Sequence, residues 1–314
     1  MRRTFYLFLA AVCLPITAIA QEAITPDATY LFERRDTCDL YMDVYNPAEG
    51  SQTTYEGIAK PTILFVFGGG FIEGTRDKEV YLPWYRQMTE NGYRIVAIDY
   101  RLGLKGSKSV GISSVNTLDK AIHIAVEDLF SATRFIIDNA ESLEIDPENI
   151  VISGSSAGAI TVLQADYELS NRTSYSNILP DGFRYKGVMA FSGAILSRNG
   201  KVKYAVPPAP TAFFHGTADV LVNYGQIVFA NLGFFGSDKL AKRFEKFGYN
   251  YNILRYHEHG HEIAEIMDIT VPEQLRFLET NVMKGIPSIL DMTIKDPRVP
   301  KGNGVQSRKE LYSN

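Results

Sequence analysis

The segment Gly154-Ser155-Ser156-Ala157-Gly158 is the part of the sequence whose residue types most clearly suggest chemistry. It is a G-x-S-x-G pattern that follows a short apolar run and precedes a pattern typical of a helix. Small residues two positions before and after Ser156 allow a sharp strand-to-helix turn that pushes the hydroxyl outward. Ser156 is therefore the candidate nucleophile, since Ser155 lacks glycines at those two positions.

A serine that attacks a carbonyl group also needs donors that stabilise the oxyanion it creates. The run Gly68-Gly69-Gly70 follows a predicted buried strand, and its missing side chains let backbone N–H groups approach a ligand. We expect the N–H groups of Gly69, Gly70 and Ala157 to form this oxyanion hole. A phosphate-binding loop is the alternative, but no lysine follows at the spacing of a Walker motif.

Asp219 and His261 are the candidate acid and base. Asp219 comes directly after a predicted buried strand, where its carboxylate can hold an imidazole in one tautomer. His261 lies in the loop after the last predicted strand, and the chain order Ser156, Asp219, His261 fits the order expected after a G-x-S-x-G motif. His259 is an alternative base, because loop geometry decides between the two. His215 is expected to shape the turn that presents Asp219.

A cluster of histidines permits a different chemistry. On an extended strand, the side chains of His257, His259 and His261 share one face and could hold a catalytic zinc ion. This alternative leaves the serine motif and the glycine run without a role. The serine mechanism requires no cofactor and no metal, so we expect neither.

These residues require a framework that brings distant loops together, and the rest of the sequence predicts one. Apolar runs and helical stripes alternate along the chain, as expected for an α/β protein with a mostly parallel, eight-stranded sheet and helices on both faces. The first two strands are expected to form an antiparallel hairpin. The predicted strands are residues 28–34, 40–45, 62–67, 93–98, 150–153, 187–191, 211–214 and 251–256. The predicted helices are residues 79–90, 118–139, 157–168, 237–247 and 272–282.

The composition does not indicate a nucleic-acid or membrane partner. The chain has 314 residues, a formal net charge of −4, 45% hydrophobic and 22% charged residues. These values are ordinary for a globular protein, and they imply no bulk attraction to nucleic acid or to an anionic membrane. The expected partner is a small-molecule or carbohydrate substrate.

The ends of the chain are expected to differ from its middle. Residues 1–20 combine a basic start, an apolar run of about a dozen residues and Ala18-Ile19-Ala20, as in a cleaved secretory signal peptide. The run is short for a bilayer span, so stable membrane insertion is not expected after cleavage. We therefore expect a secreted or periplasmic protein with one domain over residues 21–290 and a loosely ordered tail over residues 291–314.

From about residue 28 to residue 282 the chain resembles the α/β-hydrolase superfamily, in the esterase/lipase branch with carboxylesterases, hormone-sensitive-lipase-like enzymes and acetyl-xylan or feruloyl esterases. The resemblance implies that Ser156, Asp219 and His261 form a catalytic triad. Phe67 departs from the histidine that most of the lipase branch carries before the glycines. The motifs that carry the resemblance are Phe67-Gly68-Gly69-Gly70-Phe71, Asp99-Tyr100-Arg101, Asp128, Asp146-Pro147-Glu148-Asn149-Ile150 and Gly154-Ser155-Ser156-Ala157-Gly158.

The function predicted from sequence is a serine carboxylic ester hydrolase that acts on short-chain or carbohydrate-linked esters through an acyl-enzyme. Three alternatives stay open. They are a peptidase or lactonase of the same fold, a metal-dependent hydrolase that uses the three clustered histidines, and a binding module without catalytic activity.

Overall fold

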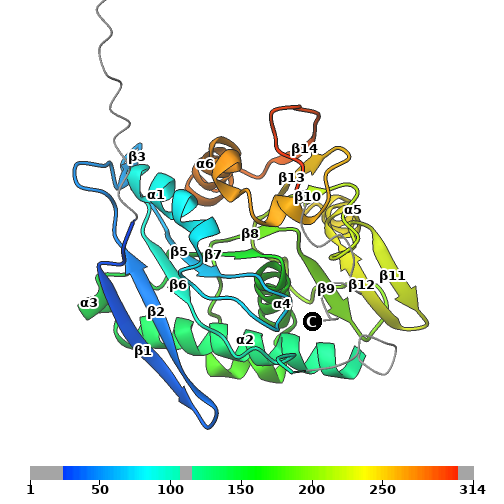
Figure 1. The fold of residues 1–314 in the computed structure, drawn as a ribbon, viewed down its shortest axis with the longest axis horizontal. Coiled ribbons are helices and arrows are strands. Elements are labelled where there is room, and N and C mark those ends of the chain that lie inside the picture. Colours follow the sequence, from blue (N-terminus) through cyan, green and yellow to red (C-terminus); the bar gives the residue numbers. More distant parts are fainter. Residues whose placement is uncertain (1–23, 107–114, 303–314) are drawn as a thin grey trace, which may run out of the picture.

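The computed structural model describes residues 24–106 and 115–302, so the predicted signal peptide lies outside the described part. A nine-stranded sheet forms the centre of the molecule (Figure 1). Its first three strands pair antiparallel and the others pair parallel, which confirms the predicted α/β class. In sheet order the strands are β1 (Ala28–Arg35), β2 (Cys38–Tyr45), β6 (Ile95–Ile98), β5 (Thr62–Val66), β7 (Ile150–Ser155), β8 (Gly187–Phe191), β10 (Thr211–Gly216), β13 (Tyr251–Tyr256) and β14 (Ile289–Ile294).

The ninth strand corrects the sequence prediction. We expected eight strands and a loose tail from residue 291, but β14 pairs in parallel with β13 and places residues 291–294 in the sheet. Its side chains alternate between half-buried and exposed, and Arg255 on β13 binds Asp291 through two hydrogen bonds of 2.6 and 2.8 Å. The edge strand β14 has no fully buried side chain. Its six residues therefore lack the continuous apolar run by which the buried strands were predicted.

Helices cover both faces of the sheet (Figure 1). One face carries α1 (Leu82–Glu90) and α6 (Val271–Phe277), which continues as a π-helical turn over Leu278–Met283. The other carries α2 (Val115–Asp138), α4 (Ala157–Asn171) and α5 (Ser237–Phe247), with α2 packed against α4. Short helical segments complete the chain: α3 (Ala140–Leu143), η1 (Glu79–Tyr81), η3 (Ser174–Ile178), η4 (His261–Ala264) and η5 (Met267–Thr270).

Aromatic packing fixes α1 and η1 on the sheet. The Phe65 ring on β5 lies 4.9 Å from the Tyr81 ring and 5.1 Å from the Trp84 ring, measured between centroids. Trp84 then donates a 2.8 Å hydrogen bond from its indole N–H to Gln274 on α6. All these groups are buried, so burial of large aromatic surface holds the loops that follow β5 and β13 in place.

The sequence analysis missed the smaller strands. After β8, β9 (Ala194–Ser197) joins the hairpin of β11 (Gln226–Phe229) and β12 (Leu232–Gly236) in a three-stranded antiparallel sheet. A second hairpin pairs β3 (Thr54–Tyr55) with β4 (Ile58–Ala59). The strands β3 and β4 have only two residues each, which is too short for periodicity to reveal them. Among the described helices, none is both long and apolar enough to cross a membrane.

A buried carboxylate on α4 makes the stability of this fold depend on pH. Asp166 accepts a 3.1 Å hydrogen bond from the Ala209 N–H and lies 3.6 Å from the Arg184 guanidinium. Burial raises the pKa of Asp166 to about 6, and the attraction of Arg184 and the bond from Ala209 only partly oppose this rise. The folded protein therefore holds a proton at Asp166 more tightly than an unfolded chain does.

We predict that the Asp166 contribution to stability falls as pH rises from about 4 to about 6, because the unfolded chain loses this proton first. The loss amounts to about 3 kcal/mol. Urea unfolding of the wild type and of Asp166→Asn across this pH range tests the prediction. The free energy of unfolding of the wild type should fall relative to that of the variant as pH rises, so any advantage of the wild type should narrow or reverse. Asp36→Asn, which changes an exposed carboxylate, is the control. An unchanged difference across the range would contradict the prediction.

Candidate active site

Ser156 lies at the corner between β7 and α4 in a strained backbone conformation. Its φ of 52° and ψ of −114° are unusual for a residue with a side chain, and the Ser156 N–H donates to the Phe191 carbonyl at 2.8 Å. A Cβ atom at Gly154 would lie 2.3 Å from the Gly158 oxygen, and one at Gly158 would lie 2.0 Å from the Val66 oxygen. Neither position has room for a side chain, so this tight corner depends on the two glycines.

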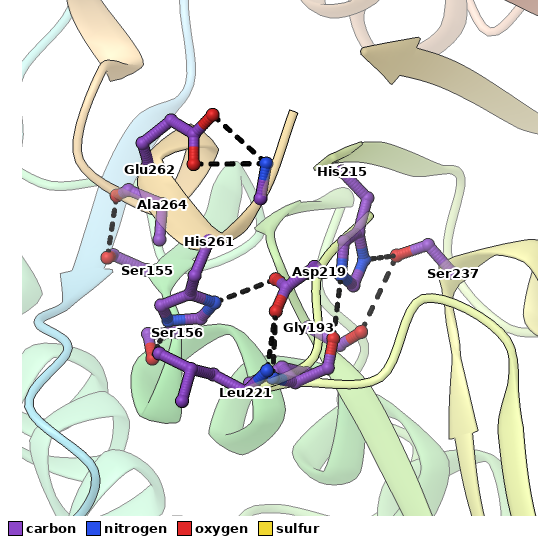
Figure 2. Close-up of polar contacts among 12 residues, drawn as sticks. Ser155, Ser156, Gly193, His215, Asp219, Leu221, Ser237, His261, Glu262 and Ala264 are labelled. Atoms are coloured by element: carbon purple, nitrogen blue, oxygen red, sulfur yellow. Dashed lines mark hydrogen bonds and ion pairs between the residues drawn. The ribbon is translucent and has the colours of Figure 1, made fainter. Parts of the chain in front are cut away.

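The structure brings Ser156, His261 and Asp219 into one hydrogen-bonded line (Figure 2). His261 Nε2 lies 2.7 Å from Ser156 Oγ, and His261 Nδ1 lies 2.7 Å from Asp219 Oδ2. The other carboxylate oxygen of Asp219 accepts the N–H groups of Leu221 and Val222 at 2.9 and 3.1 Å. The Asp219 side chain is fully buried, whereas 19% of the His261 side chain is exposed. The His261 imidazole therefore lies between the buried carboxylate of Asp219 and the accessible hydroxyl of Ser156.

The surroundings keep Asp219 ionised. Burial pushes its pKa upward, but hydrogen bonds from His215 and His261 outweigh that effect and hold the pKa well below its usual range. The carboxylate can only accept, so His261 Nδ1 carries a proton and Nε2 is free to take the Ser156 proton. Ser156 can therefore act as a nucleophile with His261 as its base, which is the arrangement needed for acyl transfer.

The glycine loop after β5 presents unused donors. Gly69, Gly70 and Phe71 have φ values of 123°, 64° and 63°, and a Cβ at Gly69 would lie 1.9 Å from the Glu73 oxygen. Within residues 24–106 and 115–302, the N–H groups of Gly69 and Gly70 donate to no protein acceptor. These two groups are therefore available to a ligand.

The loop also lies against the nucleophile. A Cβ at Gly68 would lie 3.1 Å from the Ser156 Cβ, so the backbone of the loop passes directly beside the serine. Ala157 is the first residue of α4, where a helix leaves its N–H groups free and concentrates partial positive charge. The three predicted oxyanion donors thus come from two segments that flank Ser156.

The clustered histidines do not act as a set. His259 is buried and its Nδ1 lies 3.0 Å from Glu262, whose carboxylate also accepts the Gly260 N–H. His257 is largely exposed and faces Glu258 at 3.9 Å. Of the two candidate bases, only His261 contacts the serine and the aspartate. In the described part of the chain no three His, Cys, Asp or Glu side chains converge as metal ligands would.

The sequence analysis missed a chain of buried hydrogen bonds beneath the site. The Gly68 N–H donates to the Tyr81 hydroxyl at 2.9 Å, Tyr81 donates to Ser155 Oγ at 3.2 Å, and Ser155 donates to the Ala264 carbonyl at 2.7 Å. It joins the glycine loop, the serine corner and the histidine loop, η4. Ser155 and its two partners lie 74 and 109 residues apart in the sequence, so no local pattern reveals the chain.

Among the remaining motif residues, Tyr100 supports the glycine loop, and Arg101 and Asp128 pair with each other. Tyr100 donates from its hydroxyl to the Phe67 carbonyl at 3.1 Å, and its ring lies 4.5 Å from the Phe67 ring. Arg101 binds the fully buried Asp128 through its side chain and backbone N–H. Phe67 therefore supports the loop by aromatic packing and by its carbonyl.

Comparison with solved structures shows a shared fold. A propionate-bound esterase from Thermogutta terrifontis superposes with a TM-score of 0.57 at 20% sequence identity, covering 80% of this chain and 93% of that one. The BD-FAE family profile matches residues 42–195. The structural likeness shows that this chain has the α/β-hydrolase fold. The eight strands of the central sheet that the sequence predicted are part of this fold.

The curated relatives of this chain are longer proteins. Gut esterase 1 of Caenorhabditis elegans is 30% identical over 119 residues, which are 38% of this chain and 20% of that protein. Esterase B1 of Culex pipiens is 29% identical over 107 residues, which are 32% of this chain and 18% of that protein. The chain thus spans about a fifth of the length of the curated relatives it matches.

We predict that Tyr81→Phe lowers the reactivity of Ser156 while the ring stays packed. The change leaves the Gly68 N–H and Ser155 Oγ without their buried partner, which loosens the three loops relative to one another. The rate of covalent labelling by a fluorophosphonate should fall about ten-fold. Tyr185→Phe is the matched control, because it removes a buried hydroxyl that binds Thr133 instead. Equal labelling rates for the two variants would refute the prediction.

Proposed function

We propose that this protein is an α/β hydrolase that cleaves carboxylic esters through a covalent acyl-enzyme on Ser156. The observation that carries the proposal is the pair of 2.7 Å hydrogen bonds that join Ser156 to His261 and His261 to Asp219. A serine hydroxyl is a weak nucleophile until a base takes its proton, and His261 is the base in reach. The relatives whose names describe esterases support the same activity.

The proposed reaction has two halves. Ser156 Oγ attacks the ester carbonyl carbon while His261 Nε2 takes the hydroxyl proton, and the new oxyanion accepts hydrogen bonds from Gly69, Gly70 and Ala157. His261 then donates that proton to the departing alcohol as the acyl-enzyme forms. Water attacks the acyl-enzyme with His261 again as base, and the carboxylic acid leaves. Asp219 orients His261 and offsets its positive charge throughout.

The proposed substrates are short-chain or carbohydrate-linked esters. The Thermogutta esterase has been solved with propionate and with butyrate bound, which supports short acyl groups for this chain. The resemblance to acetyl-xylan and feruloyl esterases supports an alcohol that is part of a carbohydrate. We also infer that the chain acts after export, because residues 1–20 have the pattern of a signal peptide.

We predict that Ser156→Ala lowers hydrolysis of 4-nitrophenyl acetate and butyrate by at least about a thousand-fold, because no other group can form the acyl-enzyme. Initial rates measure the effect, and circular dichroism checks that the variant is folded. Ser142→Ala, which changes an exposed serine on α3, should keep wild-type activity. Undiminished turnover in Ser156→Ala would reject the mechanism.

A substrate panel separates the remaining alternatives. We predict the highest kcat/KM on acetyl and butyryl esters and on acetylated or feruloylated sugars, and low values on amides and lactones. The panel is measured with and without a chelator, and activity should not change. Loss of activity that zinc restores would support the metal-dependent alternative. Failure of a fluorophosphonate to label the folded protein would support a binding module instead.

A further inference from the structure

His215 is a second imidazole in contact with the carboxylate of Asp219 (Figure 2). It lies at the end of β10 with no exposed surface. Its Nε2 atom is 3.2 Å from Asp219 Oδ2 and 3.0 Å from the Val222 carbonyl, and its Nδ1 atom is 2.7 Å from Ser237 Oγ. Asp219 Oδ2 therefore contacts two imidazoles, one on the side of the serine and one on the side of the core.

The partners of His215 determine where its proton lies. Both groups beside Nε2, the Asp219 carboxylate and the Val222 carbonyl, can only accept hydrogen bonds. Nε2 must therefore carry a proton and donate it. The Ser237 hydroxyl lies 2.7 Å from Nδ1 and 3.5 Å from the Gly193 carbonyl. Its one proton can be donated to the closer Nδ1 atom, and a neutral ring then satisfies both nitrogens. The ring is held at both ends, by the loop after Asp219 and by the first residue of α5.

We propose that His215 is a positioning residue that donates its Nε2–H to Asp219 and stabilises the negative charge of this carboxylate. This contact weakens the attraction between Asp219 and the proton on His261. This inference rests on the proposed function. A donor on a carboxylate stabilises its charge and weakens its attraction for a second cation. Without His215, Asp219 would bind a protonated His261 more strongly, and the base would be free to accept the serine proton only at higher pH.

Other charged groups near the two imidazoles are already paired. Beside His215, the Tyr224 ring lies 5.4 Å away, and Arg255 of β13 binds Tyr224, Asp238 and Asp291. Beside His261, the carboxylate of Glu262 is occupied by His259 and the Gly260 N–H. Asp219 is thus the charged group that both imidazoles contact directly.

Two substitutions test whether the N–H group of His215 or only the volume of its ring is needed. His215→Gln keeps an N–H group near the position of Nε2, and His215→Met keeps the volume without a donor. In His215→Met, we expect the low-pH side of the kcat/KM profile for 4-nitrophenyl butyrate, its acid limb, to shift to higher pH by about half a pH unit or more. We also expect kcat to be about ten-fold lower. His215→Gln should keep the wild-type limb and most of the activity. The pH dependence of fluorophosphonate labelling should shift in the same way.

An unshifted acid limb in a folded His215→Met variant would overturn the proposal, and so would equal shifts in the two variants. If His215→Met does not fold, nitrogen NMR of the wild type decides. The proposal requires His215 to stay protonated at Nε2 and its Nε2–H signal to move as His261 titrates. A proton on Nδ1 alone, or a signal that ignores this titration, would reject it. Retained activity in Ser156→Ala would reject the proposed function instead, and the NMR result does not depend on activity.

Discussion

The buried negative charge of Asp219 is the constraint around which this site is built. An ionised carboxylate without solvent is costly unless its oxygens are satisfied by hydrogen bonds, and Asp219 accepts from two backbone N–H groups and contacts two imidazoles. These donors come from the loop after β10, from β10 itself and from η4. The loop geometry that satisfies the charge also fixes the ring that faces Ser156, so stability and the placement of the base have the same physical origin.

Close backbone contacts provide the second half of the site. The corner at Ser156 closes because Gly154 and Gly158 let β7, α4 and β5 approach to distances that a Cβ atom would prevent. The glycine loop then lies beside the serine, and two of its N–H groups donate to no acceptor in the part of the chain that the structure describes. An oxyanion hole needs donors that are already aimed and unpaired, because donors that must reorganise during the reaction stabilise the transition state less.

Buried hydroxyl groups connect these parts. Tyr81 and Ser155 form a one-way chain in which each hydroxyl accepts one hydrogen bond and donates one, so no buried polar group on the path lacks a partner. Aromatic packing of Tyr81 against Phe65 anchors this chain to the central sheet. The loops that carry the glycines, the serine and the histidine are therefore held relative to one another by the core and not only by their own backbones.

The sequence by itself determined the fold class and eight strands of the central sheet, and it pointed to Ser156, Asp219 and His261, because strong apolar runs and the glycine motifs are local signals. It left His259 and His261 as alternative bases, since both lie in one loop and differ only in where that loop points. Tertiary structure placed His261, and not His259, against Ser156 and Asp219, revealed the hydrogen bonds of Tyr81 and Ser155, and added the edge strand β14. Each of these depends on contacts between segments far apart in the chain, and local patterns carry no record of such contacts.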